Sequence, residues 1–228
     1  MSSPQNATLI PRKAPRQARS RATVNTILDA AARVLVERGY AATTTNAVAE
    51  VAGVSVGSLY QYFPNKDSLI AALHDRHGRQ MTALLDAALL RHRGASLPEA
   101  LAGVIESAVK AHQLDADLHR VLEKQVLGLD QFPGDDESVD EIERRLRELL
   151  EAYRAEIVVE DLRLATWMLM HAVHALIHAV VLERPSGVSV KAATRETVRM
   201  ALAYLTARLW PFVEPNRRCG DTVGISNT

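Results

Sequence analysis

Three histidines, His171, His174 and His178, recur at i, i+3 and i+7 within an otherwise apolar stretch. On a helix this spacing places three imidazoles on one face, where they could coordinate a metal ion. No cysteine or carboxylate is spaced to complete such a site, and structural zinc sites use four ligands. We therefore expect polar residues at a subunit seam or beside a ligand cavity, without metal or cofactor; a proton-sensitive interface is the alternative. His112 and His119 could face the same cavity as ordinary polar residues.

The sequence contains no glycine-rich phosphate loop and no HExxH, so we expect no catalytic residues and no enzyme. A Ser or His pairing inside a cavity is the remaining enzymatic alternative, and turnover of candidate ligands would reveal it. The single cysteine, Cys219, cannot form an internal disulfide. Together with the lack of a signal-peptide pattern, this favours a cytoplasmic protein.

A second set of residues, between Thr43 and Leu69, has the pattern of a helix, a tight turn and a short second helix. Thr44 can cap the first helix, because its hydroxyl can accept a bond from a free backbone N–H. Gly53 can supply the positive φ that the turn requires. Ser55 can cap the second helix, which we expect over residues 56–62. Such a pattern is typical of a helix-turn-helix unit.

Both short helices need packing, because neither is long enough to be stable alone. Val48, Val51 and Ala52 fall on one face of the first helix. In the second helix, Leu59 and Phe63 are four residues apart and are the expected anchors. The rest of the second helix is then free to face outward.

The outward face of the second helix suits contact with DNA. Gly57 and Ser58 carry so little side chain that the helix could seat deeply in a groove. Tyr60 and Tyr62 each carry a phenolic hydroxyl that can reach phosphate. Lys66 lies at the start of a third helix, where a cation opposes the helix dipole. A phosphate bound at that helix start would explain the lysine.

The stretch AGVSVGSLYQYFPNKDSL, preceded by ILDAAARVLVERGYAATTTNAVAEV, resembles the DNA-binding domain of the TetR (tetracycline-repressor-like) family of bacterial regulators. The resemblance extends roughly from Thr23 to Leu73. It implies an all-α fold: an N-terminal three-helix helix-turn-helix domain, joined by a long helix to a larger helical ligand-binding and dimerisation domain. It also implies a homodimer on a palindromic operator, and most often a repressor released by a small, apolar effector.

The resemblance assigns roles to ten residues of the motif. The expected base contacts come from Ser55, Val56, Gly57, Ser58 and Gln61. The expected phosphate contacts come from Thr44, Thr45, Tyr60, Tyr62 and Lys66. Val56 departs from the family pattern, since this position is often basic in relatives. It offers an apolar contact, for example to a thymine methyl, and leaves the operator sequence open.

The charge distribution agrees with a DNA-binding N-terminal region. The 228 residues carry no formal net charge, but residues 1–62 hold seven Lys or Arg against three Asp or Glu, a net of +4. A basic N-terminal region on a chain with no net charge is typical of a DNA-binding domain joined to a second domain of another function. The run PRKAPRQARSR is expected to be an arm that contacts phosphates or the minor groove; a solvated tail is the alternative.

Helical periodicity continues to about residue 210 and divides the chain. We expect a basic flexible arm at 1–20, the DNA-binding domain at 21–75, an effector-binding and dimerisation domain at 76–213, and a disordered tail at 214–228. Within the first domain, Gly39 should end the first helix. The helix that starts at Lys66 should run to about residue 92 and connect the two large domains.

The stretch from Leu162 to Leu182 is apolar on nearly every side. Its length would allow a membrane span, but three histidines and the lack of aromatic belts favour a buried or interface helix. Residues expected at the effector pocket are Val104, Ile105, Leu118, Val121, Leu122, Trp167, Met170 and His171. Residues expected at the dimer interface are His174, His178, Val181, Val198, Leu202 and Leu205.

The expected partners are therefore a double-stranded palindromic operator, a small-molecule effector and a second copy of the chain, with no membrane. Half-sites of such a dimer should lie about one DNA turn, roughly 34–36 Å, apart. The alternative function is a ligand-independent or architectural DNA-binding protein controlled by a protein partner. An architectural protein would be more basic overall and would not prefer an operator over random DNA.

Overall fold

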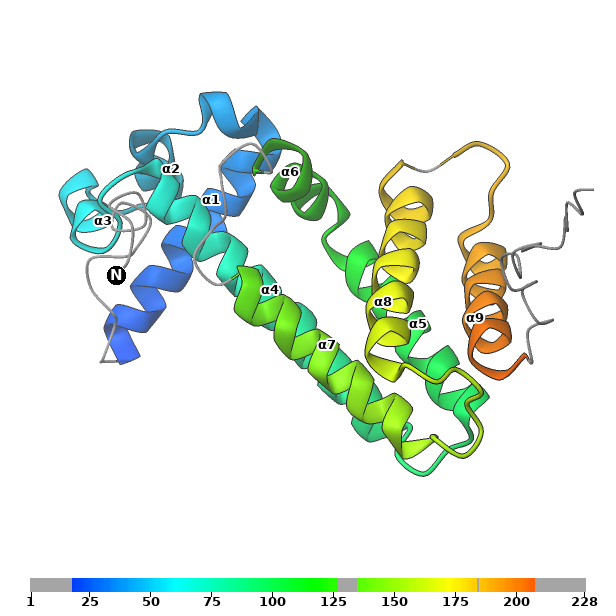
Figure 1. The fold of residues 1–228 in the computed structure, drawn as a ribbon. Helices are drawn as coiled ribbons and strands as arrows, with labels where there is room; N and C mark the ends of the chain where they lie inside the picture. Colours follow the sequence, from blue (N-terminus) through cyan, green and yellow to red (C-terminus); the bar gives the residue numbers. More distant parts are fainter. Residues whose placement is uncertain (1–17, 127–134, 184, 208–228) are drawn as a thin grey trace, which may run out of the picture.

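The computed structural model describes residues 18–126, 135–183 and 185–207, and every regular element in these ranges is a helix (Figure 1). The predicted all-α fold is confirmed. In chain order the helices are α1 (Ala18–Ala42), α2 (Thr45–Ala52), α3 (Val56–Tyr62), α4 (Lys66–Arg91), α5 (Leu97–Leu114), α6 (Ala116–Val126), α7 (Asp135–Ala152), α8 (Leu162–His178), with a π-helical turn at Ala179–Glu183, and α9 (Val190–Thr206). The arm expected at 1–20 lies almost wholly outside the described residues, as do the tail at 214–228 and Cys219.

The N-terminal helices pack around one hydrophobic core at one end of the molecule (Figure 1). Helix α1 is interrupted at Gly39, whose φ of 72° breaks the regular helix where it was expected to end, and a last turn follows to Ala42. The core is filled by fully buried side chains from four helices, namely Ile27, Val34, Leu35, Val48, Leu59, Phe63, Leu69, Ile70 and Leu73. This core holds α2 and α3 against α1 and α4.

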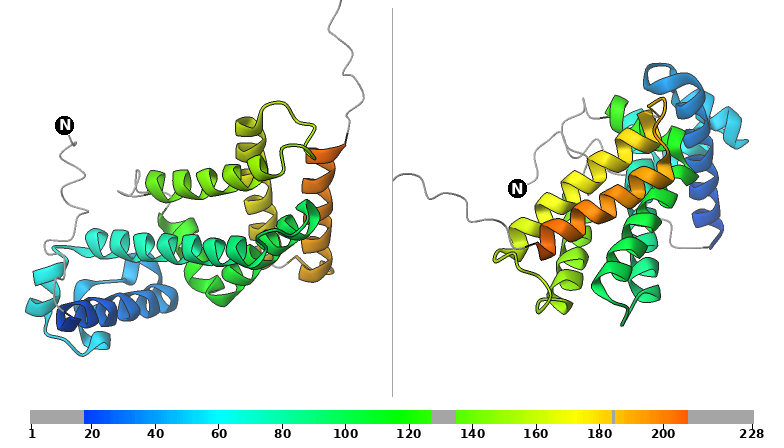
Figure 2. Two further views of the ribbon diagram at one scale, coloured as in Figure 1. Left: turned by 90° about the horizontal axis from the view of Figure 1, so that it is seen from below. Right: turned by 90° about the vertical axis from the view of Figure 1, so that its right-hand side faces the viewer.

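Helix α4 is the longest helix described, with 26 residues, and it leaves the N-terminal core to enter the second half of the molecule. Helix α7 lies along α4 in Figure 1 and in the left view of Figure 2. Helices α5, α8 and α9 pack at the far end, where α8 and α9 lie side by side (Figure 2). Helix α6 turns back and packs on α1. The two halves are therefore connected through α4 and α6.

Helix α8 and its π-helical turn, Leu162–Glu183, have the length and apolar composition of a membrane span, although only 22% of the most apolar window is buried. Buried residues such as Ala165 and Ile177 face the rest of the chain. Leu164 and Trp167 are half-exposed, at 52% and 50%. An exposed apolar face of this kind usually marks an interaction surface.

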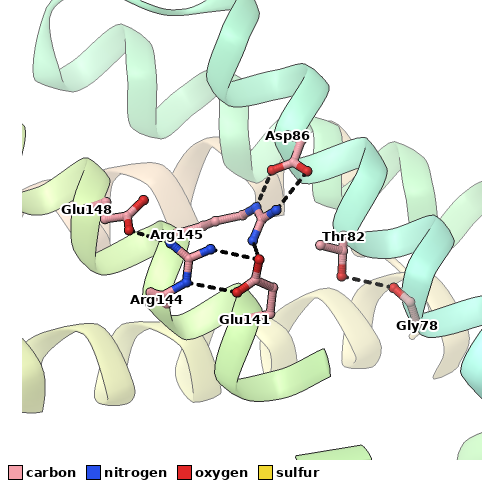
Figure 3. Close-up of polar contacts among 7 residues, drawn as sticks. All are labelled: Gly78, Thr82, Asp86, Glu141, Arg144, Arg145 and Glu148. Atoms are coloured by element: carbon pink, nitrogen blue, oxygen red, sulfur yellow. Dashed lines mark hydrogen bonds and ion pairs between the residues drawn. The ribbon is translucent and has the colours of Figure 1, made fainter. Parts of the chain in front are cut away.

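Helices α4 and α7 are also joined by charged side chains (Figure 3). The Arg145 guanidinium donates to both Asp86 carboxylate oxygens on α4, with Nη2 3.1 Å from Oδ2, and to Glu141 on α7. The hydrogen bond to Asp86 is the main cause that raises the pKa of Arg145. Among the residues that the structure describes, the neighbouring Arg144 pairs with Glu141 and Glu148, both on α7.

We expect Arg145→Ala to lower the free energy of unfolding by about 1–2 kcal/mol, because it removes charged hydrogen bonds between two helices. Arg144→Ala is the matched control and should cost about 0.5 kcal/mol or less, since i,i+4 pairs on an exposed helix contribute little. Urea denaturation followed by circular dichroism measures both values. Equal losses for the two variants would contradict a specific role of Arg145 in joining α4 to α7.

Candidate DNA-binding surface and effector cavity

The turn between α2 and α3 is built by the caps that the sequence predicts. The Thr44 hydroxyl accepts a hydrogen bond from the Ala47 N–H at 3.2 Å. Gly53 adopts φ 67°, ψ 29°, and its N–H closes the end of α2. The Ser55 hydroxyl accepts from the Ser58 N–H at 3.1 Å and starts α3. Since each cap satisfies a free backbone group, the angle between the two helices is fixed by local bonds.

The packing of this unit follows the prediction, with one difference. Leu59 and Phe63 are almost fully buried and anchor α3. On α2 the buried residues are Val48 and Ala49, whereas Val51 is 36% exposed. The apolar face of α2 is therefore rotated by part of a turn from the expected one. The rotation brings the small Ala49, in place of Val51, against the core.

The surface of α3 that remains uncovered contains the residues expected to meet DNA bases. Ser55, Val56, Gly57 and Gln61 are exposed, and Ser58 is partly exposed. A Cβ added at Gly57 would meet only the Ser55 hydroxyl, at 3.9 Å. This side of α3 is therefore open and can approach another surface closely.

Hydroxyl groups border this surface on both helices. The Thr45 hydroxyl on α2 and the Tyr60 hydroxyl on α3 lie 3.1 Å apart, so the two helices present them together. Tyr60 is 40% exposed, whereas Tyr62 is partly buried against the core. Thr44 is exposed, but its hydroxyl already caps α2. Hydroxyl groups at the border of a helix are a common means of contacting phosphate.

Lys66, at the start of α4, is held by a residue that the sequence analysis missed. Its Nζ donates to the Tyr40 carbonyl at 3.1 Å and lies 3.8 Å from the centroid of the Tyr40 ring. The Tyr40 hydroxyl donates to Asp67 Oδ1 at 2.5 Å. Burial and this bond raise the pKa of Tyr40 to about 12. The ammonium has three donors, so a phosphate contact by Lys66 stays a prediction beside this structural role.

The second half of the molecule contains a partly open apolar cavity of about 170 Å³ between α4, α5, α7, α8 and α9. Met81, Leu84 and Leu85 of α4 form one wall. Most of the other lining residues are also apolar, and the polar exceptions are Ser107, His112, Thr166 and His174. The Thr166 hydroxyl is already bonded to the Leu162 carbonyl at 2.7 Å. Such a lining suits an apolar ligand with few polar groups.

Two family models match the chain. Residues 27–73 match the model for bacterial regulatory proteins of the tetR family. Residues 96–205 match the model for the tetracyclin repressor-like C-terminal domain. Together the two matches cover more than half of the chain and follow one another in the order expected of a single protein. The chain belongs to the TetR family.

Several curated relatives of this TetR-family protein are named as HTH-type transcriptional regulators or repressors. YvkB of Bacillus subtilis is 42% identical over 29% of this chain and 35% of its own length. The repressor KstR of Mycolicibacterium smegmatis is 42% identical over 28% of this chain and 31% of its own length. An HTH-type repressor of Mycobacterium tuberculosis is 33% identical over 56% of this chain and 57% of its own length. The chain thus matches from about a third to just over half of the length of these relatives.

Solved structures share the whole fold at low identity. The fatty acid degradation regulator FadR of Bacillus halodurans has a TM-score of 0.64 and 23% identity, covering 83% of this chain and 96% of that chain. A putative TetR-family regulator of Mesorhizobium loti has a TM-score of 0.69 and 17% identity, covering 82% of this chain and 98% of that chain. The likeness therefore includes the second half of this TetR-family protein.

The structure brings only part of the expected pocket together. Val104, Ile105 and Met170 line the cavity. Leu118, Val121 and Leu122 of α6 instead pack against the N-terminal core, because α6 folds back onto α1. Trp167 and His171 are exposed on the outer side of α8. The cavity-lining residues that the sequence analysis missed come mainly from α7, namely Ile142, Leu146, Leu149 and Leu150.

The residues expected at a dimer interface are likewise divided. Val181 and Leu205 are buried within the single chain, so they are core residues here. Val198 and Leu202 of α9 are partly exposed. His178 is partly buried and His174 is exposed, and both contact other histidines. His171, expected on the same face, differs: its Nδ1 donates to the Trp167 carbonyl at 2.8 Å, and it lies outside that group.

Proposed function

We propose that this TetR-family protein is a cytoplasmic, homodimeric transcription factor that reads a palindromic operator with α3 and is released by a small apolar effector. The exposed side of α3 supports the first part. Ser55, Val56, Gly57 and Gln61 form a surface that the buried Leu59 holds rigidly toward the solvent. A helix presented in this way fits the major groove, which is wide enough to admit it.

One observation carries the effector mechanism: a single helix, α4, takes part in both sites. Its first turns belong to the N-terminal core through Leu69, Ile70 and Leu73, and its middle forms a cavity wall through Met81 and Leu84. A ligand that occupies the cavity must press against α4. Because α4 is one continuous helix, a shift there displaces the helix-turn-helix unit. A modest difference in ligand affinity between two states is then enough to change DNA binding.

The outer face of α8 supports a homodimer. Leu164, Trp167, Met168 and Leu176 of α8 and Met200 of α9 are each at least 38% exposed, and α8 and α9 lie side by side (Figure 2). A second copy of the same two helices could cover this apolar surface around a two-fold axis. A dimer would present two copies of α3 to two half-sites.

Repression is the proposed outcome because two relatives named above are described as repressors. The cavity favours control by a small molecule over the alternative, an architectural protein controlled by a protein partner. An architectural protein needs no apolar cavity beside the helix that carries its DNA-binding unit.

Selection of bound sequences from a random DNA pool at physiological salt tests the proposal. We expect enrichment of a palindrome whose half-sites are about one DNA turn, roughly 34–36 Å, apart. Salt-sensitive binding without enrichment would indicate an architectural protein and overturn the proposal. The recovered operator would also provide the probe needed for the binding experiments below.

A further inference from the structure

Five histidines from four helices meet beside the cavity, and two of them line it. They are His77 of α4, His112 of α5, His119 of α6, and His174 and His178 of α8. The ring centroids of contacting pairs lie 3.8–5.8 Å apart. Outside this group, the structure describes three further histidines, at positions 74, 92 and 171. More than half of the histidines in the chain are thus gathered at one place.

Four of these histidines present ring nitrogens to a common centre. The candidate donor atoms of His112, His119, His174 and His178 all lie within 4.8 Å of one another. Nitrogen ligands of a tetrahedral zinc ion, each at about 2.0–2.1 Å, lie roughly 3.4 Å apart. Small rotations of the side chains would close the difference. We propose that these four histidines form a binding site for one divalent transition-metal ion, with Zn²⁺ as the reference ion.

The hydrogen bond of His112 fixes which of its ring nitrogens carries the proton. Its Nδ1 lies 2.7 Å from the Ala108 carbonyl oxygen, which can only accept, so Nδ1 carries the proton. In the neutral ring, Nε2 then has the lone pair. A metal-binding histidine usually has its second nitrogen fixed in this way by a carbonyl or carboxylate.

His119 has a corresponding partner on α4. Its Nδ1 lies 2.6 Å from His77 Nε2, and its Nε2 lies 2.9 Å from His178 Nε2. The first contact lets His77 orient the ring while the second nitrogen points toward the other ligands. His77 is thus a positioning residue that would connect the metal site to α4.

The chemistry of the donor atoms also suits a transition-metal ion. The donor set consists of nitrogen alone, which suits zinc, nickel, copper or iron; magnesium and calcium prefer oxygen ligands.

The position of the site gives it a consequence beyond binding. The four ligands come from α5, α6 and α8, and His77 extends the contact to α4. The backbone around the site is held independently by Arg120 of α6, which donates to the Leu182 carbonyl at 3.0 Å. His112 and His174 also line the apolar cavity, so the ion would lie at the cavity wall. A bound ion would therefore tie together the helices that surround the proposed effector.

Zinc binding by the full-length protein, free of any affinity tag and first treated with a chelator, tests the proposal directly. Titration in competition with a chromophoric chelator gives affinity and stoichiometry, and we expect one Zn²⁺ per chain. His174→Ala is the main variant, since His174 is exposed and its loss should leave the fold intact. We expect its zinc affinity to fall at least about 100-fold, because even residues that only orient a ligand contribute 10–100-fold.

Two further variants distinguish zinc binding at this site from nonspecific zinc binding by other histidines. His171→Ala, on the same helix but outside the cluster, should leave zinc affinity unchanged. His77→Gln should weaken binding about 10–100-fold, as expected of a positioning residue. As a second measurement, Zn²⁺ should raise the melting temperature of the unmodified protein and of His171→Ala, but not that of His174→Ala. Because the experiment contains no DNA, its result does not depend on the proposed function.

The proposal would be overturned if zinc affinity were the same in His174→Ala and the unmodified protein. It would also be overturned if His171→Ala weakened binding as much as His174→Ala does. The tetrahedral ligand field can be checked with Co²⁺, which should give intense visible absorption that His174→Ala loses. Absence of that absorption from the unmodified protein, together with unsaturable zinc uptake, would likewise contradict a built site.

Discussion

A glutamate in place of Gly57 should abolish operator binding while leaving the protein at least as stable as before. Gly57 lies in the first turn of α3, on its exposed side, and an added Cβ would meet no atom closer than 3.9 Å. The side chain therefore fits without displacing any other group of the protein. Replacing a helical glycine stabilises a helix by up to about 1 kcal/mol, and an acidic residue in the first turn favours the helix dipole.

Unlike its effect on protein stability, the effect of the glutamate on operator affinity should be unfavourable. The glutamate would place a carboxylate on the surface that we propose to enter the major groove, between two phosphate backbones. Juxtaposed like charges cost several kcal/mol, so we expect operator affinity to fall at least about 100-fold. Fluorescence anisotropy with the selected operator measures this change, and thermal denaturation measures stability.

Two variants separate charge from size. Gly57→Ala adds only a methyl group and should weaken binding far less than the glutamate. Leu90→Glu introduces the same charge at a 71% exposed position in the last turn of α4, away from α3 (Figure 1), and should leave affinity within about twofold. If Gly57→Glu bound the operator normally, α3 would not be the helix that reads DNA.

The helix-turn-helix unit was predictable because its signals are local. Thr44, Gly53 and Ser55 act on backbone groups within a few residues, and the structure finds each of them at the cap expected. Capping preferences arise from free N–H and C=O groups at helix ends, and these need no knowledge of the tertiary fold. The apolar face of α2 was less certain, because it depends on how α2 sits against α1.

The effector cavity could only be predicted in part. Periodicity shows that α6 has an apolar stripe containing Leu118 and Leu122, but not which helix covers that stripe. In the structure α1 covers it, so these residues leave the cavity and the α7 residues Leu146 and Leu149 take their place. Whether the α6 residues face the cavity or α1 depends on how far α6 turns back after the short connection at Asp115.

The histidine cluster illustrates the same limit. The spacing of His174 and His178 shows that they share a face of α8, but spacing within one helix cannot show what faces them. Their partners His112 and His119 lie more than 50 residues away in the sequence. The absence of a nearby cysteine or carboxylate therefore argued against metal only within α8. Three helices supply the four nitrogens, and only the fold brings them together.

A glutamate in place of Trp167 should separate the protein into monomers and thereby remove operator binding. Trp167 is 50% exposed in the single chain, near the exposed Leu164 and Met168 on the outer face of α8. Its ring contacts the ring of His171, with centroids 4.5 Å apart, and His171 is itself exposed. Replacing Trp167 therefore leaves the interior of the chain unchanged, and the folded monomer should persist.

At a dimer interface the same position would be critical. Tryptophans near the centre of an interface commonly contribute 2 kcal/mol or more, and a buried, unpaired carboxylate adds a further cost. We expect the dimer dissociation constant to rise at least about 100-fold, which analytical ultracentrifugation measures. Operator binding should fall with it, because a monomer occupies one half-site and loses the gain from simultaneous contact with two.

Leu90→Glu again serves as the control, since it introduces the same charge at an exposed apolar position outside α8 and α9. It should remain dimeric. The two glutamate variants also distinguish two ways of losing DNA binding: Gly57→Glu should stay dimeric, whereas Trp167→Glu should not. If Trp167→Glu remained a dimer with normal affinity for the operator, the two copies would have to meet on a surface other than α8. The exposed apolar face of α8 would then need another partner.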